Sequence, residues 1–154
     1  MFVELHASSA FSFLEAASLP EALVERAAAL GYPALALVDR DGVYGAPRFH
    51  KAAKAAGIKG IIGCETTIGD WGVGIRGWGE KQEARRPPES RTLNPQSPTP
   101  SPQSPRWRLP VLVESRHGYQ NLCRLLTRMK LGAPKGEGAL SLDELDGSTA
   151  GLIA

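Results

Sequence analysis

The chain has 154 residues, which is enough for one domain with a hydrophobic core and too few for two large domains. Its composition, with 42% hydrophobic and 22% charged residues, is ordinary for a globular protein. A net charge of +2 is too small to indicate a nucleic acid or a membrane partner by itself.

Two further features bear on location. No apolar run approaches the roughly 20 residues of a membrane span, and the first residues lack the basic start and apolar block of a signal peptide. Cys64 and Cys123 lie far apart and form no CxxC pair. We therefore predict a cytoplasmic protein with two buried thiols and no membrane partner, a disulfide between the cysteines being the alternative.

The first elements are a strand and a helix. Phe2 to Leu5 forms a short apolar strand, and a helix begins near Ser18. Ser18 is predicted to cap it, Pro20 fits its first turn, and Glu21 completes a capping box. Gly31 ends the helix. Three apolar residues share its inner face: Leu23, Ala27 and Leu30.

The next segment repeats the pattern. Residues 34–38 are nearly all apolar, as in a strand buried on both faces. A helix over 46–56 ends at Gly57, and residues 59–62 and 66–68 are two further strands. Strands alternating with helices at this spacing predict parallel βαβ units and an α/β fold.

The pattern stops at residues 70–108. Residues 70–79 are rich in Gly and Trp, and residues 87–105 contain seven of the twelve prolines. Such a composition buries too little apolar area to offset its ordering entropy, so we predict a disordered insertion. A P-x-x-P docking motif at Pro102 and Pro105 is the alternative.

Regular structure returns over residues 109–154. A strand is predicted at 109–113, a helix at 118–129, a short helix capped by Ser141 and Glu144, and the opening of a strand at 151–154. The middle helix turns four apolar residues inward: Leu122, Leu125, Leu126 and Met129. Its basic residues, Arg124, Arg128 and Lys130, form either a solvated face or a contact to a phosphate backbone. Because the chain stops inside a strand, we expect a truncated domain: residues 1–69, the insertion, and a continuation over 109–154.

Polar residues gather where the predicted strands end. Five of them have ligand chemistry: His6, Glu15, Asp39, Asp41 and Glu65. Parallel α/β proteins place ligands at strand carboxyl ends, so these residues suggest a metal-binding cup. The alternatives are a structural histidine, a D-R-D-G turn with a positive φ at Gly42, and a solvated strand end. His50 and His117 are interpreted as surface or cap residues.

Several long segments resemble one known family. Residues 5–18, L-H-A-S-S-A-F-S-F-L-E-A-A-S, are similar to the opening motif of the PHP (polymerase and histidinol phosphatase) domain. More narrowly, they resemble the N-terminal domain of bacterial DNA polymerase III alpha subunits of the error-prone, translesion branch. The resemblance continues through G-Y-P-A-L-A-L-V-D-R-D-G-V-Y-G-A, A-A-G-I-K-G-I-I-G-C-E, G-Y-Q-N-L-C-R-L-L-T and the final G-L-I-A. It implies the first part of a (β/α)₇ barrel with a divalent metal site, for Zn or Mn.

Position by position, the resemblance assigns metal-site roles. His6 corresponds to the first metal-binding histidine, Glu15 replaces an aspartate ligand, and Glu65 matches the carboxylate of a G-x-E motif. These three are the remaining metal-ligand candidates. Asp39 matches the aspartate of a D-H motif. The positions where the family has a histidine and this chain has another residue are Ser8, Arg40 and Arg108.

The two arginines decide the prediction for the site. Their positive charge repels a cation, so we expect a degenerate site without a cofactor. Arg40 and Arg108 either pair with carboxylates and close the former site, or bind a phosphate of DNA or a nucleotide. The candidate partners for the first interpretation are Asp39, Asp41, Glu15 and Glu65.

The predicted function follows from the resemblance. It implies the N-terminal PHP segment of an error-prone DNA polymerase alpha subunit, a nucleotidyltransferase of DNA replication and damage-tolerance repair. We expect this segment to be structural and inactive by itself, with the remaining polymerase domains as partners and DNA reached through the parent protein. The alternatives are a metal-dependent phosphoesterase or 3′–5′ exonuclease, and a module that docks on DNA or on the polymerase.

Overall fold

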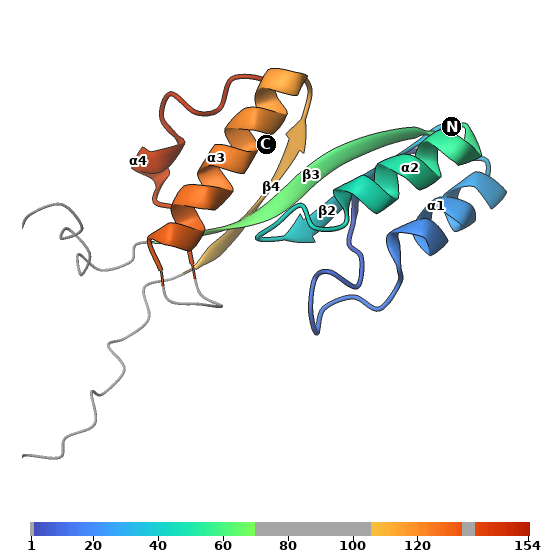
Figure 1. Ribbon diagram of the computed structural model, residues 1–154, viewed down its shortest axis with the longest axis horizontal. Coiled ribbons are helices and arrows are strands. Elements are labelled where there is room, and N and C mark those ends of the chain that lie inside the picture. The colour runs from blue at the N-terminus through green and yellow to red at the C-terminus, as the bar shows by residue number, and fades with distance from the viewer. Residues whose placement is uncertain (1, 70–105, 134–137) are drawn as a thin grey trace, which may run out of the picture.

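The computed structural model describes residues 2–69, 106–133 and 138–154 (Figure 1). Of the predicted insertion at residues 70–108, residues 70–105, which include the P-x-x-P motif, lie outside the described ranges. The elements in chain order are β1 (Glu4–Ala7), α1 (Pro20–Ala29), β2 (Ala34–Arg40), α2 (Ala46–Ala56), β3 (Lys59–Ile68), β4 (Trp107–Val113), α3 (Arg116–Leu131), α4 (Leu142–Leu145) and β5 (Leu152–Ile153). No helix within the described ranges is long and apolar enough to cross a membrane.

The strands form one mixed sheet in the order β1-β2-β3-β4-β5. β1, β2 and β3 are parallel, as predicted for βαβ units, whereas β4 runs antiparallel to β3 and to β5. The two strands predicted at 59–62 and 66–68 are one continuous strand, β3. β4 begins two residues before the predicted start, so Trp107 and Arg108 belong to the sheet and not to the insertion. The first strand lies two residues later than predicted, at β1.

The start of α1 differs from the prediction. Its N-cap is Leu19, with no side-chain cap, and Ser18 contributes its backbone carbonyl to Ala10 N–H instead. Glu21 forms no capping box, because its carboxylate binds the guanidinium of Arg48 on α2 at 2.6 Å and 3.0 Å. The inner face is centred on buried Val24 and Ala27, while the predicted core residue Leu30 is 50% exposed.

The other helices have the predicted limits within two residues. α2 spans the predicted range and ends at Gly57, whose φ of 71° is the left-handed conformation that glycine adopts freely. α3 begins two residues early, capped by the Ser115 hydroxyl, and its four predicted core residues are buried. The predicted capping box of Ser141 and Glu144 is present at α4.

The helices cover one face of the sheet in two groups. Alternate residues of β3 share a face, and on this face Gly60 lies against α2 while Cys64 packs against α3. Figure 1 shows α1 and α2 side by side over one end of the sheet and α3 over the other. Each group has its own core, around Phe49 for α1 and α2 and around Leu122 for α3. Both cysteines are free; Cys64 is buried as predicted, but Cys123 is only half-buried.

β5 is attached to α3 through backbone contact. A Cβ on Gly118 would lie 1.8 Å from the carbonyl oxygen of Gly151, so only glycine fits at position 118. Gly151 has a φ of 76°, and its carbonyl accepts from Glu114 N–H at 3.0 Å. Asn121 adds a side-chain bond, donating from Nδ2 to Ala150 O at 2.9 Å.

Candidate functional site

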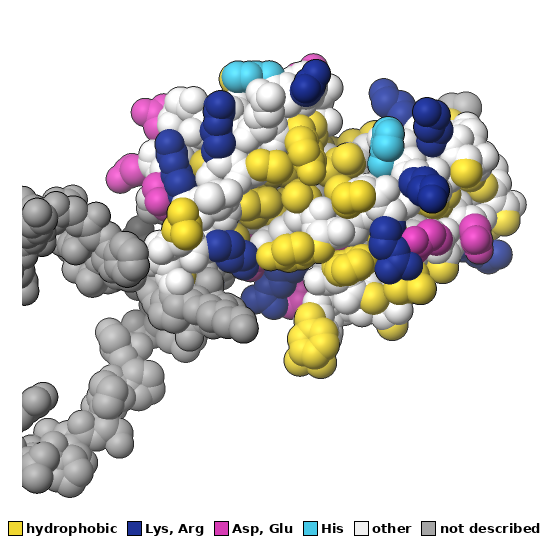
Figure 2. All heavy atoms as spheres, in the orientation of Figure 1, with side chains coloured by type: hydrophobic (Ala, Val, Ile, Leu, Met, Phe, Trp, Pro, Cys, Tyr) yellow, Lys and Arg dark blue, Asp and Glu magenta, His cyan; other side chains and the backbone are white. Residues whose placement is uncertain are grey.

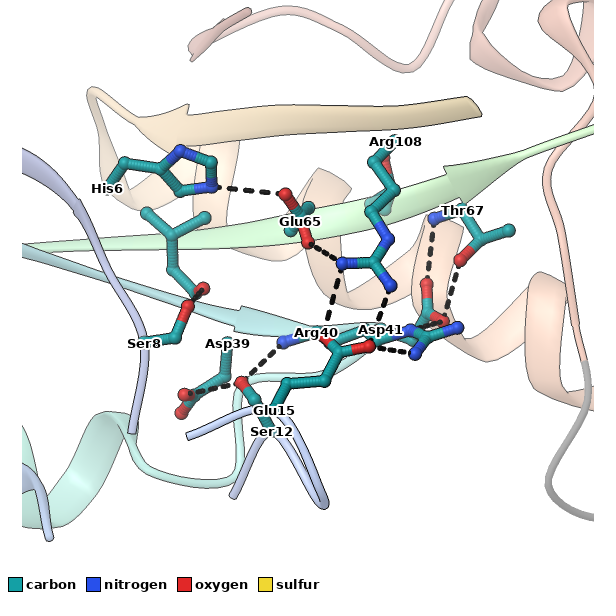
Figure 3. Close-up of polar contacts among 12 residues, drawn as sticks. His6, Ser8, Ser12, Glu15, Asp39, Arg40, Asp41, Glu65, Thr67 and Arg108 are labelled. Atoms are coloured by element: carbon teal, nitrogen blue, oxygen red, sulfur yellow. Dashed lines mark hydrogen bonds and ion pairs between the residues drawn. The ribbon is translucent and has the colours of Figure 1, made fainter. Parts of the chain in front are cut away.

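Charged side chains from four strands and one loop meet over the sheet face opposite the helices (Figure 3). Arg40 is the last residue of β2, and its register partner Glu65 lies on β3. Arg108 reaches the same place from β4, where it is paired with Thr67, two residues from Glu65. Glu15 comes from the loop between β1 and α1, which brings residues far apart in the chain into one ion-pair cluster.

Glu15 is the centre of this cluster. Arg108 donates from Nη2 to Glu15 Oε1 at 2.7 Å and from Nη1 to Oε2 at 3.2 Å. Arg40 donates from Nη1 to the same Oε1. Arg108 also bridges to Glu65 Oε2 at 3.3 Å, so one guanidinium links the loop to β3.

His6 and Asp41 lie at the margins. His6 Nε2 lies 3.1 Å from Glu65 Oε1, with a half-exposed imidazole. Arg40 Nε approaches Asp41 Oδ2 at 3.6 Å, but Asp41 is held mainly by Thr67, whose N–H and hydroxyl each donate to its carboxylate at 2.8 Å. The predicted pairing of both arginines with nearby carboxylates is therefore confirmed.

The charges change the acidity of the groups they join. Although partial burial alone would raise the pKa of Glu15, the hydrogen bonds and positive charges of Arg108 and Arg40 hold it below its usual range. The hydrogen bond to Glu15 raises the pKa of Arg108. Both side chains are thus charged at neutral pH. The pairs are partly open to solvent, since the Glu15 side chain is 28% exposed and that of Arg108 47%.

Asp39, one of the four alternative partners of the arginines, forms no ion pair with either of them. Its carboxylate is buried and accepts from Ser9 N–H at 2.7 Å, from the Ser9 hydroxyl at 2.9 Å and from the Ser12 hydroxyl at 3.1 Å. The Ser12 oxygen also accepts from the Arg40 N–H at 3.0 Å. The sequence analysis did not identify Ser9 and Ser12 as site residues. An S-S-x-x-S spacing after a strand indicates a carboxylate-binding loop only when the carboxylate that the hydroxyls bind, here that of Asp39, is already known.

Two further site positions differ from expectation. In the D-R-D-G turn the positive φ, 48°, is at Asp41 and not at Gly42. A Cβ at Gly42 would lie 2.2 Å from the exposed Tyr44 ring, so a larger residue there would require this side chain to move. Ser8, which the resemblance places at a histidine position, donates its hydroxyl to Val38 O at 3.0 Å and takes no part in the ion-pair cluster.

The residues present do not fit a metal ion. Within the described ranges, no group of three or more His, Cys, Asp or Glu side chains is arranged to hold one. A divalent ion bound to Glu15 would lie about 2.1 Å from an oxygen that already accepts from two guanidinium groups. Unit charges about 4 Å apart repel by about 4 kcal/mol at an effective dielectric constant of about 20, and a doubly charged ion by twice that. His6, Glu15 and Glu65 therefore remain ligand candidates only by residue type.

The family follows from a comparison with known domains. The PHP domain model matches residues 4–154. The chain belongs to the PHP domain family. Curated relatives of this PHP domain are named error-prone DNA polymerase: one from Ralstonia nicotianae is 39% identical over 99% of the chain, and one from Mycolicibacterium paratuberculosis is 38% identical over 97%. The chain spans only 11% and 12% of their lengths.

Solved structures also match the PHP domain. A protein from Bifidobacterium adolescentis, described as a metal-dependent phosphoesterase, has a TM-score of 0.48 and 17% identity, covering 84% of this chain and 33% of its own. An amidohydrolase from Chromobacterium violaceum with bound sulfate has a TM-score of 0.48 and 20% identity, covering 84% of this chain and 34% of its own.

Proposed function

We propose that this PHP domain is a structural segment in which an ion-pair cluster occupies the place of a metal site. The chain is homologous to the N-terminal region of error-prone DNA polymerases. Because those relatives are much longer, we propose that the remaining polymerase domains are its partners. The setting would be cytoplasmic DNA replication and translesion repair, with DNA bound through the parent protein.

One observation carries the proposal: Arg40 and Arg108 both donate to Glu15. Metal-dependent phosphoester hydrolysis needs a cation that lowers the pKa of a bound water. A guanidinium holds its own proton far above neutral pH and has no open coordination position, so it cannot supply that water. It can join carboxylates, and here it joins a loop to three strands.

We also propose how the domain is divided along the chain. The residues up to 69 and those from 107 onward would contribute to one sheet-based unit, with the proline-rich segment inserted between them. The pairing of β3 with β4 supports this division, because it joins the two parts through a long antiparallel ladder.

The alternative is a metal-dependent phosphoesterase or 3′–5′ exonuclease. The proximity of His6 to Glu65 favours it, because both residues occupy positions that the family resemblance gives to metal ligands. Catalysis would then require a cation close to Arg108, against its charge.

Metal analysis of the purified chain separates the two functions. After equilibration with Mn²⁺ or Zn²⁺ and dialysis, we expect far less than one equivalent of metal, no hydrolysis of a chromogenic phosphodiester above buffer, and no template-directed nucleotide incorporation. One equivalent of metal that is lost in a His6→Ala variant would establish the enzyme instead. A variant combining Arg40→His with Arg108→His tests the reason, because removing both guanidinium groups should increase metal retention.

A further inference from the structure

The two helices at the ends of the sheet carry only positive charge. α2 contains Arg48, Lys51 and Lys54 and no acidic residue. α3 contains no acidic residue either. Its four basic residues are Arg116, Arg124, Arg128 and Lys130. All four are exposed, as are Lys51 and Lys54.

Both helices present these charges on the same side of the molecule. They pack on the same face of β3, which places their outer surfaces together. Figure 2 shows Lys and Arg side chains over both helices, with a band of hydrophobic side chains between them. We call this surface the basic face, made of Lys51, Lys54, Arg116, Arg124 and Arg128.

The side chains of the basic face form no ion pair with the carboxylates of the described residues. Arg40, Arg48 and Arg108 form ion pairs with Glu15, Glu21, Asp41 and Glu65, and His6 Nε2 lies 3.1 Å from Glu65 Oε1. Within the same residues, no carboxylate lies within 4.0 Å of a basic-face side chain. The small net charge of +2 therefore does not exclude a local group of cations on the two helices.

We propose that the basic face binds the phosphate backbone of a nucleic acid duplex. Arg116, Arg124 and Arg128 are spread over about 18 Å of helix, at 1.5 Å per residue. A duplex carries one phosphate charge per about 1.7 Å of its axis, so a line of cations of this length meets several phosphates at once. An acidic polypeptide is flexible and would lose conformational entropy in holding its charges along that line, whereas a duplex holds its phosphates in fixed positions. Backbone contacts of this kind bind without sequence preference.

Binding is measured with the full chain by fluorescence anisotropy, using a labelled DNA duplex of about 20 base pairs. We expect affinity to fall steeply between about 50 mM and about 200 mM NaCl. Arg124→Glu and Arg128→Glu should each weaken binding about fivefold and lower the salt slope by about one. Arg26→Glu is the matched control, because it makes the same charge change at an exposed position of α1 outside the basic face.

Four results would overturn the proposal. The first is no binding by the wild type at about 50 mM NaCl, and the second is equal weakening by Arg26→Glu and Arg124→Glu. The third is that polyglutamate displaces the labelled duplex as effectively as unlabelled duplex does, which would identify an acidic protein partner. The fourth is loss of helical circular dichroism in the basic-face variants, unless Lys51→Glu, on the other helix, remains folded and still weakens binding.

Discussion

Glu15→Gln tests the ion-pair cluster directly. The substitution keeps the side-chain shape and removes the charge that Arg40 and Arg108 share. An exposed ion pair contributes about 0.2–1 kcal/mol, and here two pairs use one carboxylate whose side chain is 28% exposed. Arg108 keeps Glu65 and Arg40 keeps Asp41, which limits the loss. We expect the free energy of unfolding to fall by about 1–2 kcal/mol, or about 3–6 °C in the midpoint of thermal unfolding.

The assay is urea unfolding followed by circular dichroism at low and high salt. Glu21→Gln is the control, because it removes the same charge from an arginine pair that joins only α1 and α2. The loss in Glu15→Gln should exceed that in Glu21→Gln and should shrink at about 1 M NaCl, where the Debye length is about 3 Å. Equal losses in the two variants, or a loss that salt leaves unchanged, would refute the reasoning.

Three further predictions concern titration, the buried serine and the thiols. The folded pKa of Glu15 lies below its ordinary value of 4.5, so its ion pairs stabilise the fold above that pH, and their contribution is lost as the pH falls through the lowered pKa. The urea midpoint of the wild type should therefore drop more on acidification than the midpoint of Glu15→Gln. Parallel pH curves for the two proteins would contradict this prediction. Ser12→Ala removes one bond to buried Asp39 and one from Arg40 N–H, and should cost about 2 kcal/mol, whereas Ser18→Ala should change the unfolding free energy little. Burial raises the pKa of the Cys64 thiol to about 12, so iodoacetamide at about pH 8 should label Cys123 in the folded chain well before it labels Cys64. Peptide mass spectrometry measures the labelling of each cysteine. Equal labelling of the two cysteines would contradict the buried position of Cys64.

Local signals predicted the elements, and they failed where long-range pairing decides. The apolar run of β2 and the stop at Gly57 are properties of a few adjacent residues, and both predictions are confirmed. The antiparallel direction of β4 depends on the path of the chain between Ile68 and Trp107, which no local pattern encodes. Ser18 has the right residue type for a cap, but the loop uses its carbonyl to bind Ala10.

The candidate site shows the same division. Opposite charges at strand ends predicted that Arg40 and Arg108 would bind carboxylates, but the choice of carboxylate follows from strand register. Arg108 reaches Glu65 because it lies across from Thr67 in the β3–β4 ladder. The Asp39 carboxylate does not pair with an arginine because it accepts hydrogen bonds from the hydroxyls of the loop before α1, such as that of Ser9. Hydroxyl groups are common in loops, so Ser9 carried no signal until its distance to Asp39 was known.

The close approach of Gly118 and Gly151 sets a limit on how this end of the molecule can evolve. Any side chain at position 118 would displace the main chain at 151. A smaller neighbouring side chain cannot relieve the clash at position 118, because the atoms in the way belong to the Gly151 main chain, and at position 151 the φ of 76° favours glycine. Drift in this region is therefore confined to the residues around the pair, and a glycine at each of the two positions should mark every sequence that keeps this junction of α3 and β5.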